Sequence, residues 1–169
     1  MKTIKGPAVF LAQFVDKSPP FDSLDGICKW ASKLGYKGIQ IPTWESSLID
    51  LDKASDSQDY CDELIGKVRS FGLEITELST HLQGQLVAVH PAYDLMFDNF
   101  APDNLKKNPK ERAKWAVETV KKAAIASRRL GLKSHETFYG ALLWQTWHQW
   151  PQAPKGLCEM GFEELTKIW

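Results

Sequence analysis

The sequence predicts an α/β fold built from parallel βα repeats, and two observations predict it. Three similar segments, "KLGYKGIQI", "SFGLEITEL" and "RLGLKSHET", each place a glycine after an amphipathic run and before a short strand-like run. Glycine commonly ends a helix because it adopts the left-handed conformation without a Cβ penalty. Helix-like and strand-like segments also alternate along the chain, a pattern that indicates parallel strands joined by right-handed crossovers. The helices are therefore expected to end at Gly35, Gly72 and Gly131.

Three helices are predicted from apolar residues at helical spacing. The first starts at Asp22 or Ser23, whose side chains can cap a helix N-terminus. The second runs roughly over residues 57–71. The third begins with Pro109, which is tolerated in a first turn, and ends near Leu130. Between them we expect four strands, over residues 8–14, 38–41, 73–79 and 132–138.

The loops favour one of two architectures. The loops that follow the strands are long, over residues 42–56, 80–108 and 139–157. Those that follow the helices are only the glycine turns. No G-x-G-x-x-G or Walker-type loop occurs. An open doubly wound sheet stays possible, but elaboration at the C-terminal strand ends is typical of a TIM (β/α)8 barrel.

The predicted organisation is one domain over residues 1–169, with about four βα units that would make half a barrel. The last residues, "GFEELTKIW", form an apparent helix without a stop signal. We therefore expect a truncated half-barrel whose missing C-terminal half is a candidate partner.

Composition excludes several classes of function. The 169 residues carry 21 basic and 21 acidic side chains, so the formal net charge of zero argues against a nucleic-acid partner. No apolar run approaches the roughly 20 residues that span a bilayer, so no membrane partner is expected. The three cysteines lack a C-x-x-C spacing, which favours free thiols in the cytoplasm.

Candidate site residues gather after the third strand. There the stretch "ELSTHLQGQLVAVHPAYD" places His81, Gln83, Gln85 and His90 in a predicted loop. Because strand side chains alternate, Glu77 and His81 would share one face. A barrel mouth would satisfy such polar groups, and a histidine there can act as an acid, a base or a ligand. The structural alternative is a histidine that hydrogen-bonds the loop.

Other strand ends add candidates. Trp44 and Glu45 follow the second strand, and His135 and Glu136 lie on the fourth. Since His135 and Glu136 are adjacent, they should point to opposite faces and cannot serve one site together. Three further tryptophans, which would either stack on sugar faces or pack in a core, are Trp144, Trp147 and Trp150.

The segments "LAQF", "SLDGICKWASKLGYKGIQIPTW", "ELSTHLQGQLVAVHPAYD" and "QWPQAP" together resemble the sugar phosphate isomerase/epimerase family of xylose isomerase-like TIM barrels. The resemblance covers the first half of the family's barrel. It implies a divalent metal, Mn, Mg or Zn, with ligands expected beyond residue 169. It also implies proton transfer on a keto-sugar or polyol through an enediolate, with carboxylates as acid and base. Glu136 and Tyr139 depart from the family's pattern.

On this resemblance His81 is the candidate catalytic residue, and the candidate substrate-binding residues are Trp44, Glu77, Gln83 and His135. The isomerase or epimerase activity is expected of a full-length parent, with this chain alone inactive. Two alternatives stay open. One is a non-catalytic half-barrel that forms a homo-oligomer or binds a partner, because open sheet edges need cover. The other is an endonuclease IV-like abasic-site nuclease, against which the zero net charge argues.

Overall fold

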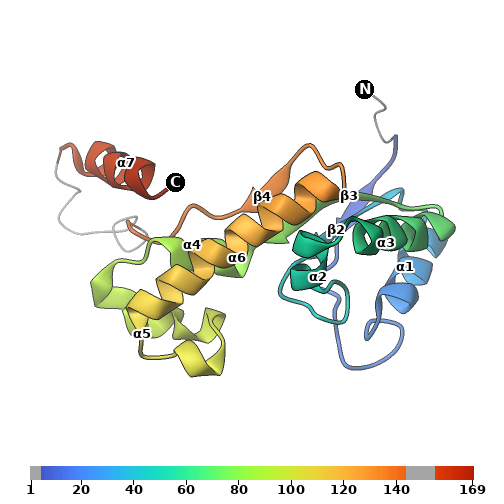
Figure 1. Cartoon of the computed structure of the whole chain (residues 1–169), viewed down its shortest axis with the longest axis horizontal. Helices are drawn as coiled ribbons and strands as arrows, with labels where there is room; N and C mark the ends of the chain where they lie inside the picture. The colour runs from blue at the N-terminus through green and yellow to red at the C-terminus, as the bar shows by residue number, and fades with distance from the viewer. Residues whose placement is uncertain (1–4, 144–154) are drawn as a thin grey trace. The chain divides into compact units, whose positions relative to one another are not determined.

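A computed structural model describes residues 5–143 and 155–169, and its contacts divide the chain into two compact units. Unit 1 comprises Met1–Thr80 and Lys121–Glu136, and unit 2 comprises His81–Val120 and Thr137–Trp169. Figure 1 shows the elements along the chain. The prediction of a single domain stays a prediction, and the two units are described separately.

Unit 1 is a parallel sheet covered by helices. Its strands and helices are β1 (Ala8–Phe10), α1 (Leu24–Lys33), β2 (Gly38–Pro42), α2 (Leu51–Asp56), α3 (Gln58–Ser70), β3 (Glu74–Thr80), the end of α6 (Pro109–Arg129) and most of β4 (His135–Thr137). The strand order is β1-β2-β3-β4, and β1–β2 and β2–β3 pair in parallel.

The three helix ends share one hydrogen-bond pattern. Gly35, Gly72 and Gly131 have φ of 86°, 73° and 70°. At the first helix end, Tyr36 N donates to the carbonyl of Ala31, five residues earlier. At the other two ends, the residue after the glycine likewise donates its N–H to the carbonyl five residues earlier. This is the Schellman motif, in which a left-handed residue lets the chain turn directly into the next strand. The predicted repeat and its glycine helix ends are confirmed.

The core of unit 1 lies between the sheet and its helices. Alternate strand residues, Val9, Ile39, Ile41 and Leu78 among them, are buried against apolar side chains of α1, α3 and the end of α6. These helices pack into one core on one face, and the strands follow chain order. A doubly wound sheet would instead reverse its strand order and carry helices on both faces. The α/β class is confirmed, with the winding of consecutive βα units of a TIM barrel.

Unit 2 is mainly helical. Its elements are α4 (His81–Val87), η1 (Pro91–Tyr93), α5 (Asp94–Phe97), η2 (Asp98–Phe100), η3 (Asp103–Leu105), the first part of α6, and α7 (Leu157–Ile168). The last of these confirms the helix expected at "GFEELTKIW". A small core contains Leu86, Phe97 and Ala116. No described helix is long and apolar enough to cross a membrane.

Several predicted boundaries are wrong. Strand β1 ends at Phe10 and not at Phe14, because the chain turns there with Phe14 N donating to Leu11 O. Strand β4 starts at His135 and not at residue 132. Helix α2 occupies part of the predicted loop 42–56, since the Asp50 side chain accepts a hydrogen bond from Lys53 N and caps it. The predicted loop 80–108 contains α4, α5 and three short 3-10 helices.

Candidate functional site

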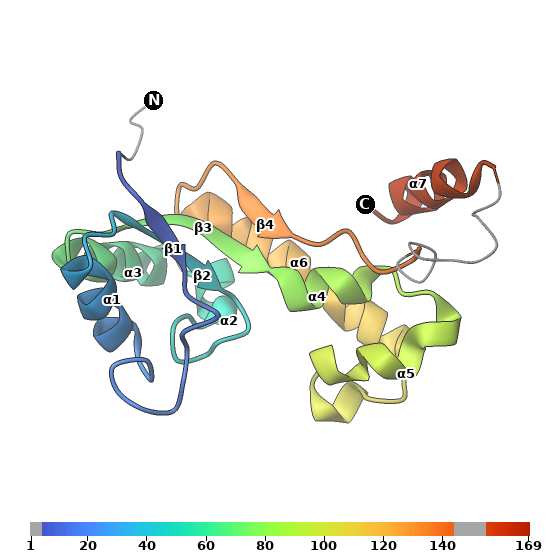
Figure 2. The same ribbon diagram turned by 180° about the vertical axis from the view of Figure 1, so that it is seen from behind.

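The face of the unit 1 sheet that is turned away from α1 and α3 carries a row of aromatic and polar side chains. We call it the open face. Phe10, Gln40 and Glu77 occupy paired positions on β1, β2 and β3, so they lie side by side. Figure 2 shows β1 and β2 with α1 and α3 to one side of them. Because their neighbours Val9, Ile39 and Leu78 enter the helix-covered core, alternation directs this row onto the open face.

Glu77 is the best-anchored charged group of the row. Gln40 Nε2 donates to Glu77 Oε2 at 2.7 Å, and Ser134 Oγ donates to Glu77 Oε1 at 2.6 Å. Both donors are uncharged, and no ion pair involves Glu77 among the residues that the structure describes. An ionised carboxylate can only accept hydrogen bonds, and each oxygen has two lone-pair sites. Glu77 therefore keeps acceptor capacity on both oxygens.

An aromatic pair borders this polar row. Phe10 is followed in the row by Gln40, and its ring meets that of Trp44 edge to face, with 6.3 Å between the ring centroids. Trp44 is half-buried directly after β2, where the sequence placed it. The open face thus combines an apolar ring surface with a fixed carboxylate. Binding sites for small polar organic molecules typically combine apolar walls with a few placed polar groups.

On strand β4, the adjacent side chains of His135 and Glu136 point to opposite faces of the sheet. The two ring nitrogens of His135 lie 2.8 Å from Thr80 Oγ1 and 3.0 Å from Ser127 Oγ on α6. His135 therefore points to the helix side of the sheet. Its neighbour Glu136 is exposed, and alternation places it on the open face with Ser134. The predicted opposite orientations of the two residues agree with this geometry.

The predicted loop position of His81, Gln83 and Gln85 is wrong, because α4 follows β3 without an intervening loop. The His81 ring stacks on that of Phe138, with centroids 4.8 Å apart and 27° between planes. Gln85 Nε2 donates to the His81 carbonyl at 3.2 Å, one helical turn back. His81 consequently lies at the start of a helix and does not continue the β3 alternation with Glu77.

Buried polar oxygens without a partner lie near these positions. In unit 2, Gln83 is 2% exposed and Gln85 is 7% exposed, and neither Oε1 meets a donor among the described residues. In unit 1 the same holds for Ser79 Oγ, two residues after Glu77. His90 instead accepts a hydrogen bond from Ala92 N and caps η1. Buried polar groups usually find a partner, so each of these oxygens could accept a water or ligand donor.

Metal-binding side chains do not form a cluster in the described part of the chain. No group of three or more His, Cys, Asp or Glu side chains within residues 5–143 and 155–169 is arranged to hold a metal ion. Glu77 and Glu136 are the carboxylates of the open face, and two carboxylates do not make the full ligand set of a divalent cation. The described residues thus do not fit the expected metal, and no chemical step is derived through one.

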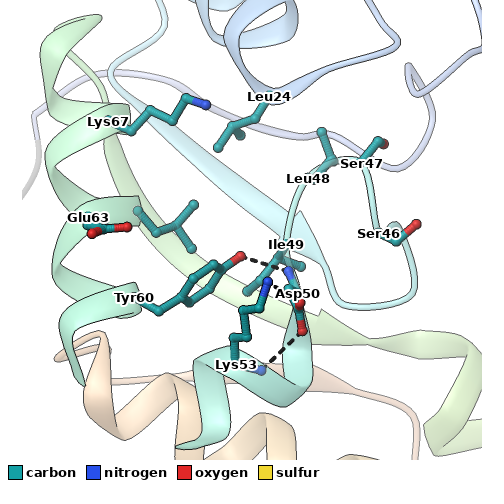
Figure 3. Close-up of a pocket in the computed structure, with 11 residues that line it drawn as sticks. Leu24, Ser46, Ser47, Leu48, Ile49, Asp50, Lys53, Tyr60, Glu63 and Lys67 are labelled. Atoms are coloured by element: carbon teal, nitrogen blue, oxygen red, sulfur yellow. Dashed lines mark hydrogen bonds and ion pairs between the residues drawn. The ribbon is translucent and has the colours of Figure 1, made fainter. Parts of the chain in front are cut away.

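Unit 1 also has an open groove of about 420 Å³ between α1, α3 and the loop before α2. Figure 3 shows Tyr60 reaching from α3 to this loop, where its hydroxyl accepts the Asp50 N–H at 2.8 Å. Lys53 pairs with Asp50, and Lys67 pairs with Asp25, each at 3.2 Å. These contacts hold the loop and neutralise both ammonium groups, so they favour no particular ligand.

No protein-family model matches the chain, and no curated protein matches it. Among solved structures, the chain is similar to D-psicose 3-epimerase with D-tagatose from Clostridium cellulolyticum H10, at 13% identity and a TM-score of 0.33. The match covers 73% of this chain and 49% of that chain, so this chain spans about half of that enzyme. At this TM-score the similarity carries no argument about function.

Sequence reasoning found Glu77 and Trp44 but missed Gln40 and Ser134, which hold the Glu77 carboxylate. A signal for Gln40 exists in "GIQIP", where a single amide interrupts an apolar strand. Ser134 has no such signal, because serine is common in turns before strands. The calls on Trp144, Trp147 and Trp150 lie outside the described residues.

Proposed function

We propose that this chain is part of a sugar isomerase or epimerase, and that its open face binds a keto-sugar or polyol. The observation that carries the proposal is the Glu77 carboxylate, fixed by Gln40 and Ser134 at 2.7 and 2.6 Å beside an aromatic pair. A sugar presents hydroxyl donors along its edge and C–H groups on its face. The carboxylate suits the hydroxyl groups, and the rings suit the C–H face.

The proposed reaction moves one proton between carbons. A base removes the proton from the carbon next to the ketose carbonyl, and the electron pair forms a C=C bond as the carbonyl oxygen becomes an enediolate oxyanion. Isomerisation follows when the former carbonyl carbon takes up a proton and the hydroxyl of the neighbouring carbon passes its proton to the enediolate oxygen, so that the carbonyl moves. Epimerisation follows when a proton returns to the other face of the original carbon and the original carbonyl re-forms. A divalent metal, Mn, Mg or Zn, would polarise the sugar oxygens and belongs to the proposal, although the described residues do not form its site.

His81 remains the proposed acid or base, and Gln83 remains a proposed substrate-binding residue. His135, which the sequence suggested for substrate binding, is turned to the helix side and is not part of the proposed open-face site. Support for His81 comes from its position at the first residue of α4, directly after the C-terminal end of β3. In βα folds this end of a strand is where catalytic groups usually lie. His81 belongs to unit 2 and Glu77 to unit 1, so the two roles are tested separately.

Ligand-observed NMR with a panel of ketoses and polyols tests the binding role. The chain should bind a member of this panel, and Glu77→Gln should weaken binding roughly tenfold or more, because hydrogen bonds to a charged group contribute about 1.5–3 kcal/mol. Glu163→Gln is the matched control, since Glu163 is exposed on α7. Absence of binding by any ketose or polyol, or equal binding by Glu77→Gln, would contradict the proposal.

The catalytic role of His81 is tested by exchange of substrate C–H for solvent deuterium in any form of the protein that turns over a ketose. His81→Phe keeps an aromatic ring to stack on Phe138, whereas His81→Ala removes it. A proton-transfer role predicts that both variants lose exchange by about 100-fold or more. Full exchange in His81→Phe would instead show that the ring acts by packing alone.

A further inference from the structure

We infer that the open face selects an uncharged ketose or polyol, bound through two neighbouring hydroxyl groups, and rejects its phosphate ester. This inference rests on the proposed function and names its substrate class. The geometry that carries it is the arrangement of charge on the open face of unit 1, where the Glu77 carboxylate is fixed and a phosphate would find like charge.

The fixed charge of this row is negative. Glu77 ends the row on β3, and Glu136 lies on the neighbouring strand β4, exposed on the same side. The other members of the row, Phe10 and Gln40, are uncharged. Among the described strand residues that register and alternation place on this face, none is Lys, Arg or His. His135, the strand residue that could carry positive charge, is turned to Thr80 and Ser127.

Two basic residues of unit 1 are held in ion pairs away from this row. Arg69 pairs with Glu74 at 3.0 Å, at the N-terminal end of β3. Lys122 on α6 pairs with Asp52 on α2 at 2.6 Å. Phosphate recognition in proteins usually relies on Arg or Lys side chains, or on the N-terminus of a helix. Neither basic residue reaches the row of Phe10, Gln40 and Glu77, so a phosphate placed there would meet carboxylates.

The hydrogen-bond geometry of Glu77 fits a pair of hydroxyl groups. Gln40 occupies one lone-pair site on Oε2, and Ser134 occupies one on Oε1. One site on each oxygen remains, and two vicinal hydroxyl groups of a sugar can donate to both. Gln40 Nε2 is a donor that cannot accept, so it takes up an acceptor site of Glu77 and leaves the others open. An ionised carboxylate binds hydroxyl groups and repels a phosphate dianion.

Paired titrations of the wild-type chain with D-fructose and D-fructose 6-phosphate, followed by ligand-observed NMR, test this inference. We expect D-fructose to bind at least about tenfold more tightly than its phosphate, because two like charges within several ångströms repel measurably even in water. Raising the salt concentration from about 0.01 M to about 1 M should narrow the difference, since the Debye length falls from about 30 Å to about 3 Å.

A charge-reversal variant provides an independent test. Glu136→Lys should raise the affinity for the phosphate ester relative to D-fructose by about tenfold, because it places a cation on the open face. Glu163→Lys, on an exposed position of α7, is the matched control and should leave the ratio unchanged. Circular dichroism of each variant checks that the fold persists.

The outcomes separate this inference from the proposed function. Preference for D-fructose that Glu136→Lys reverses or abolishes supports both. Equal or tighter binding of the phosphate by wild type, or a ratio that Glu136→Lys leaves unchanged, overturns the inference while sugar binding itself still stands. Failure of every ketose, polyol and phosphate ester to bind overturns the proposed function, and the inference with it.

Discussion

Cys158 lies exposed on α7, whereas the sulfur atoms of Cys28 and Cys61 are buried in the core of unit 1. Burial raises the pKa of the Cys28 thiol to about 12, with a smaller contribution from the Asp25 carboxylate. Burial also raises the pKa of Cys61, whose thiol donates to the Ala54 carbonyl. Since the thiolate is the reactive form, both buried cysteines should be inert at neutral pH.

A disulfide reagent should therefore modify one thiol of the folded protein at pH 7 and three thiols in denaturant. Mass spectrometry should locate the first modification at Cys158. Rapid modification of Cys28 in the folded protein would contradict the burial of α1 against the sheet. The control is Cys158→Ser, which should abolish native-state labelling and leave two reactive thiols in denaturant.

At the same scale, single residues show what sequence could predict. The polar character of Glu77 is visible because a carboxylate in a strand needs a partner or water. Its actual partners are not visible, because Gln40 and Ser134 lie 37 and 57 positions away and meet it only through strand pairing. Likewise, alternation predicted that His135 and Glu136 diverge, but only the position of α6 decides that His135 takes the helix side.

At the scale of elements, sequence predicted the helices that end in glycine better than the segments between strand and helix. The glycine signal is local, because a left-handed residue serves the Schellman motif wherever it occurs. Helix α4 has no such signal. Its sequence, HLQGQLV, contains a central glycine, which is unfavourable in a helix interior, and two glutamines that are buried although polar residues usually mark an exposed face. Its burial therefore depends on contacts that arise only in the folded chain.

Gly84 on α4 supplies a prediction at this scale. A Cβ at this position would lie 2.8 Å from Phe138 N and would also contact Thr137 Oγ1 and Phe138 O. The backbone after β4 cannot yield as a side-chain end can. Gly84→Ala should therefore destabilise the protein by about 1–3 kcal/mol, the usual cost of overpacking, although alanine has the higher helix propensity.

Urea denaturation of Gly84→Ala measures this effect, with Gly66→Ala as the control. Gly66 lies within α3, and a Cβ there would meet nothing within 4 Å. The control should be stabilised by up to about 1 kcal/mol through helix propensity alone. Equal stability of the two variants would show that α4 does not pack closely against residues 137 and 138.

At the scale of the whole molecule, unit 2 depends on a buried charge network. Arg112 is 1% exposed, and its guanidinium donates to the carboxylates of Asp94 and Asp98, both at 2.6 Å. It also donates to the Asp94 carbonyl. The backbone N–H of Lys107 donates to Asp98 and, together with Arg112, lowers the pKa of that carboxyl group. The network joins α5, η2 and the first part of α6.

The lowered pKa of Asp98 determines the direction in which the stability of unit 2 changes with pH. A carboxyl group whose folded pKa lies below its unfolded value, about 3.9, adds stability above that value. The contribution disappears as the pH falls through the folded pKa. Acid should therefore loosen unit 2 below about pH 4, while the core of unit 1, built around apolar residues, lacks this particular sensitivity.

Arg112→Met is expected to destabilise unit 2 by about 3–5 kcal/mol at pH 7, because it leaves the buried Asp98 carboxylate and the partly buried Asp94 carboxylate without their cation. Hydrogen exchange followed by mass spectrometry should show faster exchange over residues 81–120, with β1, β2 and β3 retaining their protection. Lowering the pH to about 3 should shrink the difference between variant and wild type, since the protonated carboxyl groups no longer need the guanidinium. Equal loss of protection in both units would instead show that they unfold together, because α6 contributes residues to both.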